Sequence, residues 1–283
     1  MDSIRLASVP YVNARPLTWG FTAGPYRTVF EVRNVPPSGI PDLLRNGRVD
    51  VGLIPSIEYL RLENVEILPH LCIAAKRRAR SVLLASRVAL PEVRRVAVDV
   101  SSRTSVALLR ILLDQKGLRD VEFEPRPPAL RAMLRDCEAA LIIGDPALAA
   151  DTGGLHVLDL GAEWASETGL PFVFALWAAR RGAVLPDGVR PFLESRQMGV
   201  ANIPRIAREA APRLGLTPAG VESYLRTNIH YHLGSEEARG LELFFRRAAA
   251  LGLAAGDRAI VFREGPSRAP LPATGAQARI VYE

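Results

Sequence analysis

The sequence has few of the residues that metal and redox sites use. It holds two cysteines in 283 residues, Cys72 and Cys137, and they do not form a CxxC pair. Since they can build neither a zinc ribbon nor a dithiol centre, we predict two free thiols packed as small hydrophobic side chains. Of the four histidines, His230 and His232 are two apart, a spacing that puts them on different faces of a helix. We therefore predict no metal site.

Long apolar runs, clustered charge and aromatic residues are also scarce. Asp2 and Arg5 interrupt the first apolar stretch, which is too short to span a bilayer, so we expect a cytoplasmic protein with no signal peptide and no membrane partner. The net charge of +6 is dispersed and aromatic residues make up 6%, so we expect no nucleic-acid partner. A basic surface favours small anionic substrates. Without a P-loop or a Ser-His-Asp or Cys-His arrangement, we predict no cofactor and no covalent triad.

What the sequence does contain is a regular alternation of strand-like and helix-like segments, typical of an α/β protein with mostly parallel strands. An amphipathic helix is expected at Ser105–Lys116, with Gly117 ending it. Beyond Pro186 the pattern is helical only. The main predicted strands are Ile4–Val9, Val49–Ile54, Ile67–Ala74, Ser81–Ser86, Arg95–Val100, Ala139–Ile143 and Pro171–Ala178, and the late helices are Arg190–Leu214, Pro218–Asn228 and Glu236–Leu251.

Small polar residues recur where these strands end. An open α/β sheet binds its ligand outside the carboxyl ends of its strands, so these residues are candidates for a common site. The candidates are Tyr11 and Asn13 after the first strand, Ser56 after "GLIP", Ser81 before an apolar strand, Ser102, Arg103, Thr104 and Ser105 in "SSRTS", and Gly144 and Asp145 in "GDPA".

Each candidate also has a structural interpretation. Ser102 or Thr104 could simply cap the following helix, and so could Asn13, Ser56 and Asp145. The alternative is a ligand site, because hydroxyls and free N–H groups at a helix start bind carboxylate or phosphate well. "SSRTS" holds more hydroxyls than one cap needs. The set offers donors and an amide but no strong base, which suits a small dicarboxylate whose charge develops during a reaction.

Several motifs together resemble the chorismate dehydratase family of the futalosine route to menaquinone. The match covers roughly Ile4 to Leu253, nearly the whole chain. It rests on "SVPYVNARPL", "GRVDVGLIPSIEYL", "RSVLLAS", "VDVSSRTSVALLRILL", "AALIIGDPAL" and "ETGLPFVFALWAAR", which occur in the family's order.

The resemblance implies a two-lobe fold of the type II periplasmic-binding-protein class, turned into a cytoplasmic enzyme, with the ligand in the cleft between the lobes. We expect lobe 1 at residues 1–86 and 177–263 and lobe 2 at 87–176. The chain would cross between them near Ser86 and near Pro171–Trp177. Residues 264–283, rich in Gly, Pro and Ala, are expected to form a loosely held tail.

The implied reaction removes water from the small-molecule substrate chorismate and leaves an aromatic ring. Asn13 matches the asparagine that the family needs, Thr104 and Ser105 match its second-lobe hydroxyls, and Ser56 and Ser81 match first-lobe positions. We hypothesise that the two Ser/Thr helix starts each receive one substrate carboxylate. An amide cannot act as the base, so Asn13 would orient the substrate or contact the leaving hydroxyl. Two bases stay open, a carboxylate of the substrate itself and Glu167.

Three other functions fit this fold. A sister enzyme of the same pathway, a dihydroxynaphthoate synthase, uses a histidine base, and no histidine follows the strand ends named above. A solute-binding protein would bind the anion without reacting and normally carries an export signal or lipid anchor. A regulator would usually carry a helix-turn-helix segment.

Overall fold

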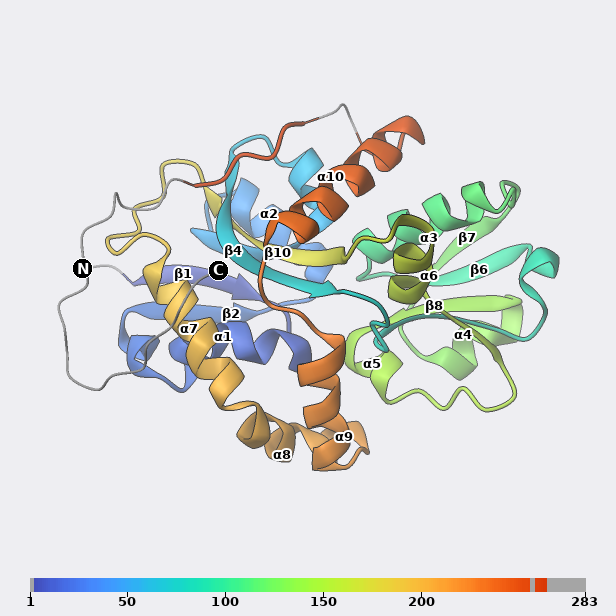
Figure 1. Ribbon diagram of the computed structural model, residues 1–283, viewed down its shortest axis with the longest axis horizontal. Coiled ribbons are helices and arrows are strands. Elements are labelled where there is room, and N and C mark those ends of the chain that lie inside the picture. The colour runs from blue at the N-terminus through green and yellow to red at the C-terminus, as the bar shows by residue number, and fades with distance from the viewer. Residues whose placement is uncertain (1–2, 255–257, 264–283) are drawn as a thin grey trace.

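Two lobes lie side by side, each built on its own sheet of five strands (Figure 1). The computed structural model describes residues 3–254 and 258–263, so the predicted tail at 264–283 lies outside the described part. In spatial order the first sheet contains β2 (Phe30–Asn34), β1 (Ile4–Ser8), β3 (Val51–Pro55), β10 (Phe172–Arg180) and β4 (Val65–Ala75). The second contains β7 (Glu122–Arg126), β6 (Arg95–Asp99), β8 (Ala139–Ile143), β5 (Val82–Ser86) and β9 (His156–Asp159).

Both sheets are mixed, but four strands of each run in the same direction, so the prediction of mostly parallel strands is confirmed with one exception in each sheet. β1, β2 and β3 run parallel, as do β6, β7 and β8. β10 is antiparallel to both of its neighbours, and so is β5. The reason is the route of the chain. Parallel strands end at the cleft, whereas β5 and β10 each follow a crossover between lobes and enter their sheet from the cleft side.

These two strands also correct the predicted lobe boundaries. Val82–Ser86 is predicted for lobe 1, but β5 pairs with β8 and β9 in the second sheet. Residues 171–176 are predicted for lobe 2, but β10 pairs only with β3 and β4. The crossovers therefore lie at residues 76–81 and 169–171, earlier along the chain than predicted.

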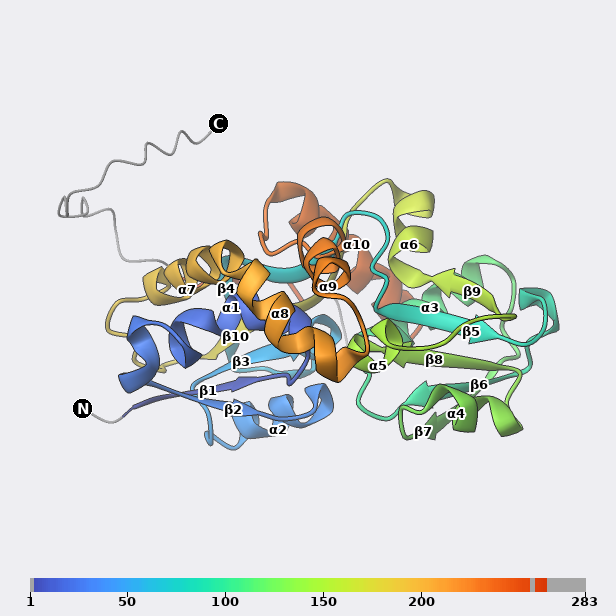
Figure 2. The same ribbon diagram turned by 90° about the horizontal axis from the view of Figure 1, so that it is seen from below.

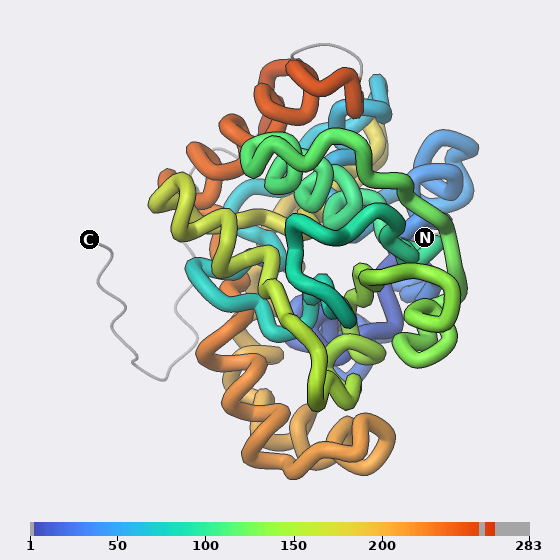
Figure 3. Tube along the Cα trace, turned by 90° about the vertical axis from the view of Figure 1, so that its right-hand side faces the viewer, coloured from blue at the N-terminus to red at the C-terminus, as the bar shows by residue number. Residues whose placement is uncertain are grey.

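The helices cover the sheets and join the lobes. The late helices reach the second lobe on two sides, since α10 packs against α3 and α8 against α5 (Figures 2 and 3). The helices are α1 (Arg15–Thr22), α2 (Ile40–Arg45), α3 (Thr104–Gln115), α4 (Leu130–Asp136), α5 (Gly144–Leu148), α6 (Leu160–Thr168), α7 (Arg190–Ala201), α8 (Ile203–Leu214), α9 (Pro218–Ser223) and α10 (Ser235–Ala250).

Glycine and proline residues determine where several of the helices end or begin. Gly117 follows α3 with a φ of +74° and Gly252 follows α10 with a φ of +65°, the left-handed conformation that ends helices. The predicted helix Arg190–Leu214 is instead two, since Pro204 lies in the first turn of α8 and has no N–H to continue α7. Within the described part, no helix is long and apolar enough to cross a membrane.

Candidate functional site

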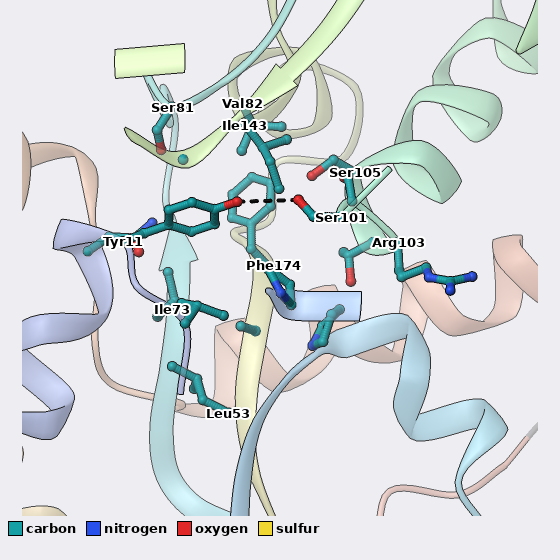
Figure 4. A pocket seen from close by; sticks show the side chains of 18 of the residues that line it. Tyr11, Leu53, Ile73, Ser81, Val82, Ser101, Arg103, Ser105, Ile143 and Phe174 are labelled. Atoms are coloured by element: carbon teal, nitrogen blue, oxygen red, sulfur yellow. Dashed lines mark hydrogen bonds between the residues drawn. The ribbon is translucent and has the colours of Figure 1, made fainter. Parts of the chain in front are cut away.

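The facing edges of the two sheets enclose a cavity of about 600 Å³, part of it open to solvent (Figure 4). The concave, largely apolar lining of this cavity, with a few polar groups, is typical of small-molecule sites. Its apolar wall comes from Leu53, Ile73, Val82, Ile143 and Phe174, among others. The polar residues that line it are Tyr11, Asn13, Ser81, Ser101, Ser102, Arg103, Thr104 and Ser105, so the structure brings together most of the predicted site, Gly144 included.

Tyr11 spans the cavity from lobe 1 to lobe 2. Its ring packs on Gly144, where an added Cβ would lie 2.9 Å from ring carbons. Its hydroxyl lies 3.3 Å from Ser101 Oγ, as Figure 4 shows. Ser101 Oγ donates to Asp99 Oδ1 at 2.7 Å, so the Tyr11 hydroxyl donates to the serine. Burial raises the pKa of Tyr11, and the phenol is therefore a hydrogen-bond donor and not a base.

Asn13 lies in a 3₁₀ turn, Val12–Ala14, directly after β1. Its Oδ1 is buried and has no hydrogen-bond partner among the described residues. The interpretation as a helix cap is wrong, because neither this turn nor α1 has a side-chain cap. An amide carbonyl left unpaired beside a cavity is open to a donor on a ligand.

Asp145 is close to this turn but does not line the cavity. Its Oδ1 accepts the Val12 N–H at 2.9 Å and its Oδ2 accepts from Arg213 at 2.6 Å. It does not cap α5 either, since the cap position is Ile143. The interpretation of Asp145 as the cap of α5 is therefore wrong, and its place in the substrate site stays a prediction. The carboxylate instead ties lobe 2 to the turn that carries Asn13.

The start of α3 carries hydrogen-bond donors that no side chain of the described residues caps. Arg103 occupies the cap position and no side chain caps the helix, so its first N–H groups have no intrahelical partner and lie at the positive end of the dipole. Ser102 Oγ is buried and has no hydrogen-bond partner within residues 3–254 and 258–263. Ser105 also lines the cavity, whereas the exposed Arg103 side chain points away from the centre (Figure 4).

Thr104 and Ser56 contact each other across the two lobes. Thr104 Oγ1 accepts the Ile57 N–H at 3.2 Å and lies 3.4 Å from Ser56 Oγ. Ser56 is buried, donates to the Val173 carbonyl at 2.7 Å and does not line the cavity. The start of the turn Ser56–Arg61 is thus occupied by Thr104, so the described structure does not support a second carboxylate site there.

Ser81 lines the cavity and is held by two residues that the sequence did not reveal. Tyr224 donates to Ser81 Oγ at 2.7 Å from a buried position after α9. Asp159 accepts the Ala79 N–H at 2.9 Å and the Arg80 N–H at 2.8 Å, and it also caps α6. No local signal in the sequence links either residue to Ser81.

The cavity offers donors without a protein base. None of the described residues that line it is Asp, Glu, His or Lys. Glu167, one of the two bases left open, lies on α6 and pairs with Arg247 at 3.5 Å. Among the described residues, no group of His, Cys, Asp and Glu could hold a metal ion. Both cysteines are buried and free, as predicted.

Comparisons with known sequences agree on one family. A family model described as menaquinone biosynthesis matches residues 4–250. A curated chorismate dehydratase from Thermus thermophilus is 35% identical over 262 residues, which cover 86% of this chain and 93% of the relative. A chorismate dehydratase from Campylobacter jejuni is 27% identical over 252 residues, covering 87% of this chain and 98% of the relative.

Solved structures confirm the predicted fold. A protein from Archaeoglobus fulgidus matches with a TM-score of 0.72 at 19% identity, covering 89% of this chain and 98% of that one. The periplasmic aliphatic sulphonate binding protein SsuA from Escherichia coli matches with a TM-score of 0.63 at 17% identity, covering 98% of each chain. The architecture is therefore the two-lobe arrangement of periplasmic binding proteins, with the cavity between the lobes.

Proposed function

The chain belongs to the menaquinone biosynthesis family, and on that premise we propose how its cavity carries out a dehydration. It is a chorismate dehydratase, a hydro-lyase that removes water from chorismate to give 3-enolpyruvylbenzoate. The proton leaves C3, the hydroxyl leaves C4, and the ring becomes aromatic. The observation that carries the mechanism is an apolar cavity with an open helix start on one side and an unpartnered amide carbonyl on the other.

The start of α3 receives the ring carboxylate in this proposal. When the C3 proton is removed, the electron pair at C3 delocalises through the C2–C1 double bond onto that carboxylate. Donors that face it stabilise the transition state more than the ground state, which is what accelerates a reaction. Ser102, Ser105 and the first N–H groups of α3 are such donors. The apolar wall, with Phe174 and Ile143, packs against the ring.

The base is the substrate's own enolpyruvyl carboxylate, which takes the C3 proton and passes it to the departing C4 hydroxyl, so that water leaves. This carboxylate is attached through the ether oxygen of C3, so it can reach the C3 proton through a six-membered arrangement of atoms. No described residue that lines the cavity is a better base, and Glu167 is held by Arg247. The protein then contributes orientation and charge stabilisation, which alone can supply much of a rate enhancement.

We place the reaction in the futalosine route to menaquinone and in the cytoplasm, where other enzymes would make its substrate and use its product. The family description supports a role in menaquinone biosynthesis. Fractionation of cells that express a tagged chain tests the location. Loss of 3-enolpyruvylbenzoate from a deletion strain, together with its menaquinone requirement, tests the route.

Asn13→Ala is the first test of the site. Purified protein is incubated with chorismate without added metal or cofactor, and the product is followed by chromatography. We expect product from the wild type and a loss of about 10²-fold or more in Asn13→Ala, because the substrate is no longer oriented. Asn64→Ala removes an exposed asparagine outside this cavity and should retain full activity.

Other outcomes separate the alternatives. Equal activity in wild type and Asn13→Ala would keep the reaction and remove Asn13 from its role. Tight chorismate binding without product would indicate a binding protein. If chorismate neither binds nor reacts, a cyclic futalosine derivative, the substrate of the sister enzyme, is the next compound to test.

A further inference from the structure

A second hollow adjoins the cavity at the start of α3, and we call it the outer groove. One wall of the outer groove is a face of α3 formed by Arg103, Val106, Ala107 and Arg110, whose spacing of i, i+3, i+4 and i+7 is that of one helix face. Ser102 and Arg103 line both the cavity and the outer groove. A molecule in the groove therefore lies next to the donors at the start of the helix.

Apolar side chains make up most of the rest of the outer groove. They come from β6 and the residue after it, from β7 and from the segment after α10, and they are Val98, Val100, Phe123, Pro125 and Leu253. Val100 is 53% exposed. Covering an exposed apolar side chain with a ligand is favourable, because apolar surface is removed from water. The groove therefore offers a contact surface for the apolar body of a ligand.

The charge that the outer groove presents to solvent is positive. Its charged lining residues in the described part are Arg61, Asp99, Arg103 and Arg110. Arg61 is paired with the buried Glu58 at 2.6 Å. Asp99 is 1% exposed, and its Oδ1 accepts from the N–H and the hydroxyl of Ser101. Arg103 and Arg110 are exposed, and their guanidinium groups have no ion pair or hydrogen bond with the described residues.

Arg110 is held in an orientation that suits a carboxylate. Its Cζ lies 4.0 Å from the centre of the Phe123 ring, so the guanidinium stacks on that ring. Stacking leaves the N–H groups at the edge of the guanidinium free, and their planar arrangement matches the two oxygens of a carboxylate. Arg103 points away from the centre of the cavity (Figure 4) and lines the groove as well. The two arginines therefore form an anion site outside the cavity.

We propose that the outer groove is a second, transient binding site for the dianionic substrate, in which Arg110 and Arg103 bind a carboxylate before the substrate enters the cavity. The proposal rests on the function proposed above. Chorismate carries two carboxylates on a cyclohexadiene ring, so its charge suits the arginines and its ring suits the apolar wall. Charge of one sign in a cleft raises the rate at which an oppositely charged ligand associates, and salt reduces this gain.

Arg110→Glu tests the outer groove. The product, 3-enolpyruvylbenzoate, keeps both carboxylates and does not react further, so its binding can be followed by stopped-flow fluorescence. We expect its association rate constant to fall by about tenfold at low salt, because the groove no longer attracts a dianion. The difference from wild type should shrink as salt is added. The kcat for chorismate should change by less than about twofold, since Arg110 does not line the cavity.

Arg27→Glu is the matched control, because it changes the net charge of the protein by the same amount. Arg27 is exposed in the turn Pro25–Thr28, which precedes β2 and lies at the end of the first sheet away from the cleft. We expect its association rate constant to stay within about twofold of wild type. Arg110→Gln, which removes one charge without adding another, should lose less than Arg110→Glu. Thermal melting of all three variants checks their folds.

Three results would overturn the proposal for the outer groove. They are an unchanged association rate constant in Arg110→Glu, an equal fall in Arg27→Glu, and a loss that does not respond to salt. An equal fall in both variants would assign the effect to the overall charge of the protein. Failure of the wild type to dehydrate chorismate would instead overturn the function on which the proposal rests.

Discussion

Gly144 determines how closely the two lobes approach at the Tyr11 ring. Its φ is +63°, and a Cβ there would lie 2.9 Å from the ring carbons. A side chain at this position meets two separate penalties, one from the backbone conformation and one from the ring. Gly154 has a similar φ of +74°, but no atom of the described part of the chain lies within 4 Å of an added Cβ, so it carries the first penalty alone.

Gly144→Ala and Gly154→Ala therefore separate the two effects. We expect Gly154→Ala to lose about 1–2 kcal/mol of unfolding free energy, because an alanine is strained at positive φ, and Gly144→Ala to lose more, because it also clashes with the Tyr11 ring. Only Gly144→Ala should also raise KM, by about tenfold or more, because Tyr11 must move out of the wall. Chemical denaturation and steady-state kinetics measure the two quantities. An unchanged KM in Gly144→Ala would contradict the role given to the Tyr11 ring.

The residues that could be predicted are those whose signal is local. The hydroxyls at the start of α3 follow a buried strand and precede an amphipathic pattern, so their position at the cleft can be predicted from neighbouring residues. The partners of Ser56 and Ser81 are not readable in this way. Thr104 is 48 residues from Ser56, and Tyr224 is 143 residues from Ser81. Only the assembled fold brings such pairs together.

At the scale of elements, β9 and α6 were not predicted although they support the site. β9 has four residues and its first two are exposed, so it lacks the alternation that marks a half-buried strand. Asp159 ends this strand and caps α6, accepting from Gly161 and Ala162. The same carboxylate accepts two N–H groups of the crossover before Ser81. A short edge strand thus holds the crossover in place.

Asp159→Asn should affect both stability and catalysis. In this variant an amide nitrogen would replace one carboxylate oxygen and face a backbone N–H that the oxygen accepts in the wild type. The N–H would lose its acceptor, so we expect a loss of about 2 kcal/mol of unfolding free energy. KM for chorismate should rise as well, because the crossover would no longer be held by Asp159 and Ser81, which ends it, would shift in the cavity. Asp151→Asn is the control. Asp151 is exposed and accepts from Gly153 in a loop, and we expect a change within about 0.5 kcal/mol and unchanged kinetics. A stability loss without any kinetic change would contradict the link to Ser81.

At the scale of the whole molecule, hydrogen bonds between the lobes surround the cavity. Thr104 Oγ1 accepts from the Ile57 N–H, and the hydroxyls of Tyr11 and Ser101 are hydrogen-bonded to each other. The Asp145 carboxylate accepts from the Val12 N–H and from Arg213. Of these, the pair of Asp145 with Arg213 is charged, and the arginine side chain is 59% exposed. Any separation of the lobes that admits a substrate must break these contacts and form them again.

Arg213→Ala should weaken substrate binding without unfolding the protein. We expect KM for chorismate to rise by about fivefold, the size of a partly exposed ion pair. The difference from wild type should shrink as salt is added, since salt screens exposed charge pairs. Arg226→Ala, which breaks an ion pair with Glu222 four residues away, serves as the control and should leave KM unchanged. If the difference in KM between Arg213→Ala and wild type does not change with salt, the ion pair between Asp145 and Arg213 does not contribute to holding the lobes together.

The place of β10 in the first sheet has a consequence for the order in which a growing chain can fold. β10 lies between β3 and β4, although all five strands of the second sheet precede it along the chain. When synthesis on the ribosome has reached residue 171, the second sheet is complete while β3 and β4 have no strand between them. Two unpaired strand edges are then exposed, which is the condition that favours aggregation. The second lobe can therefore fold before the first lobe, whose sheet is complete only when β10 has been synthesised.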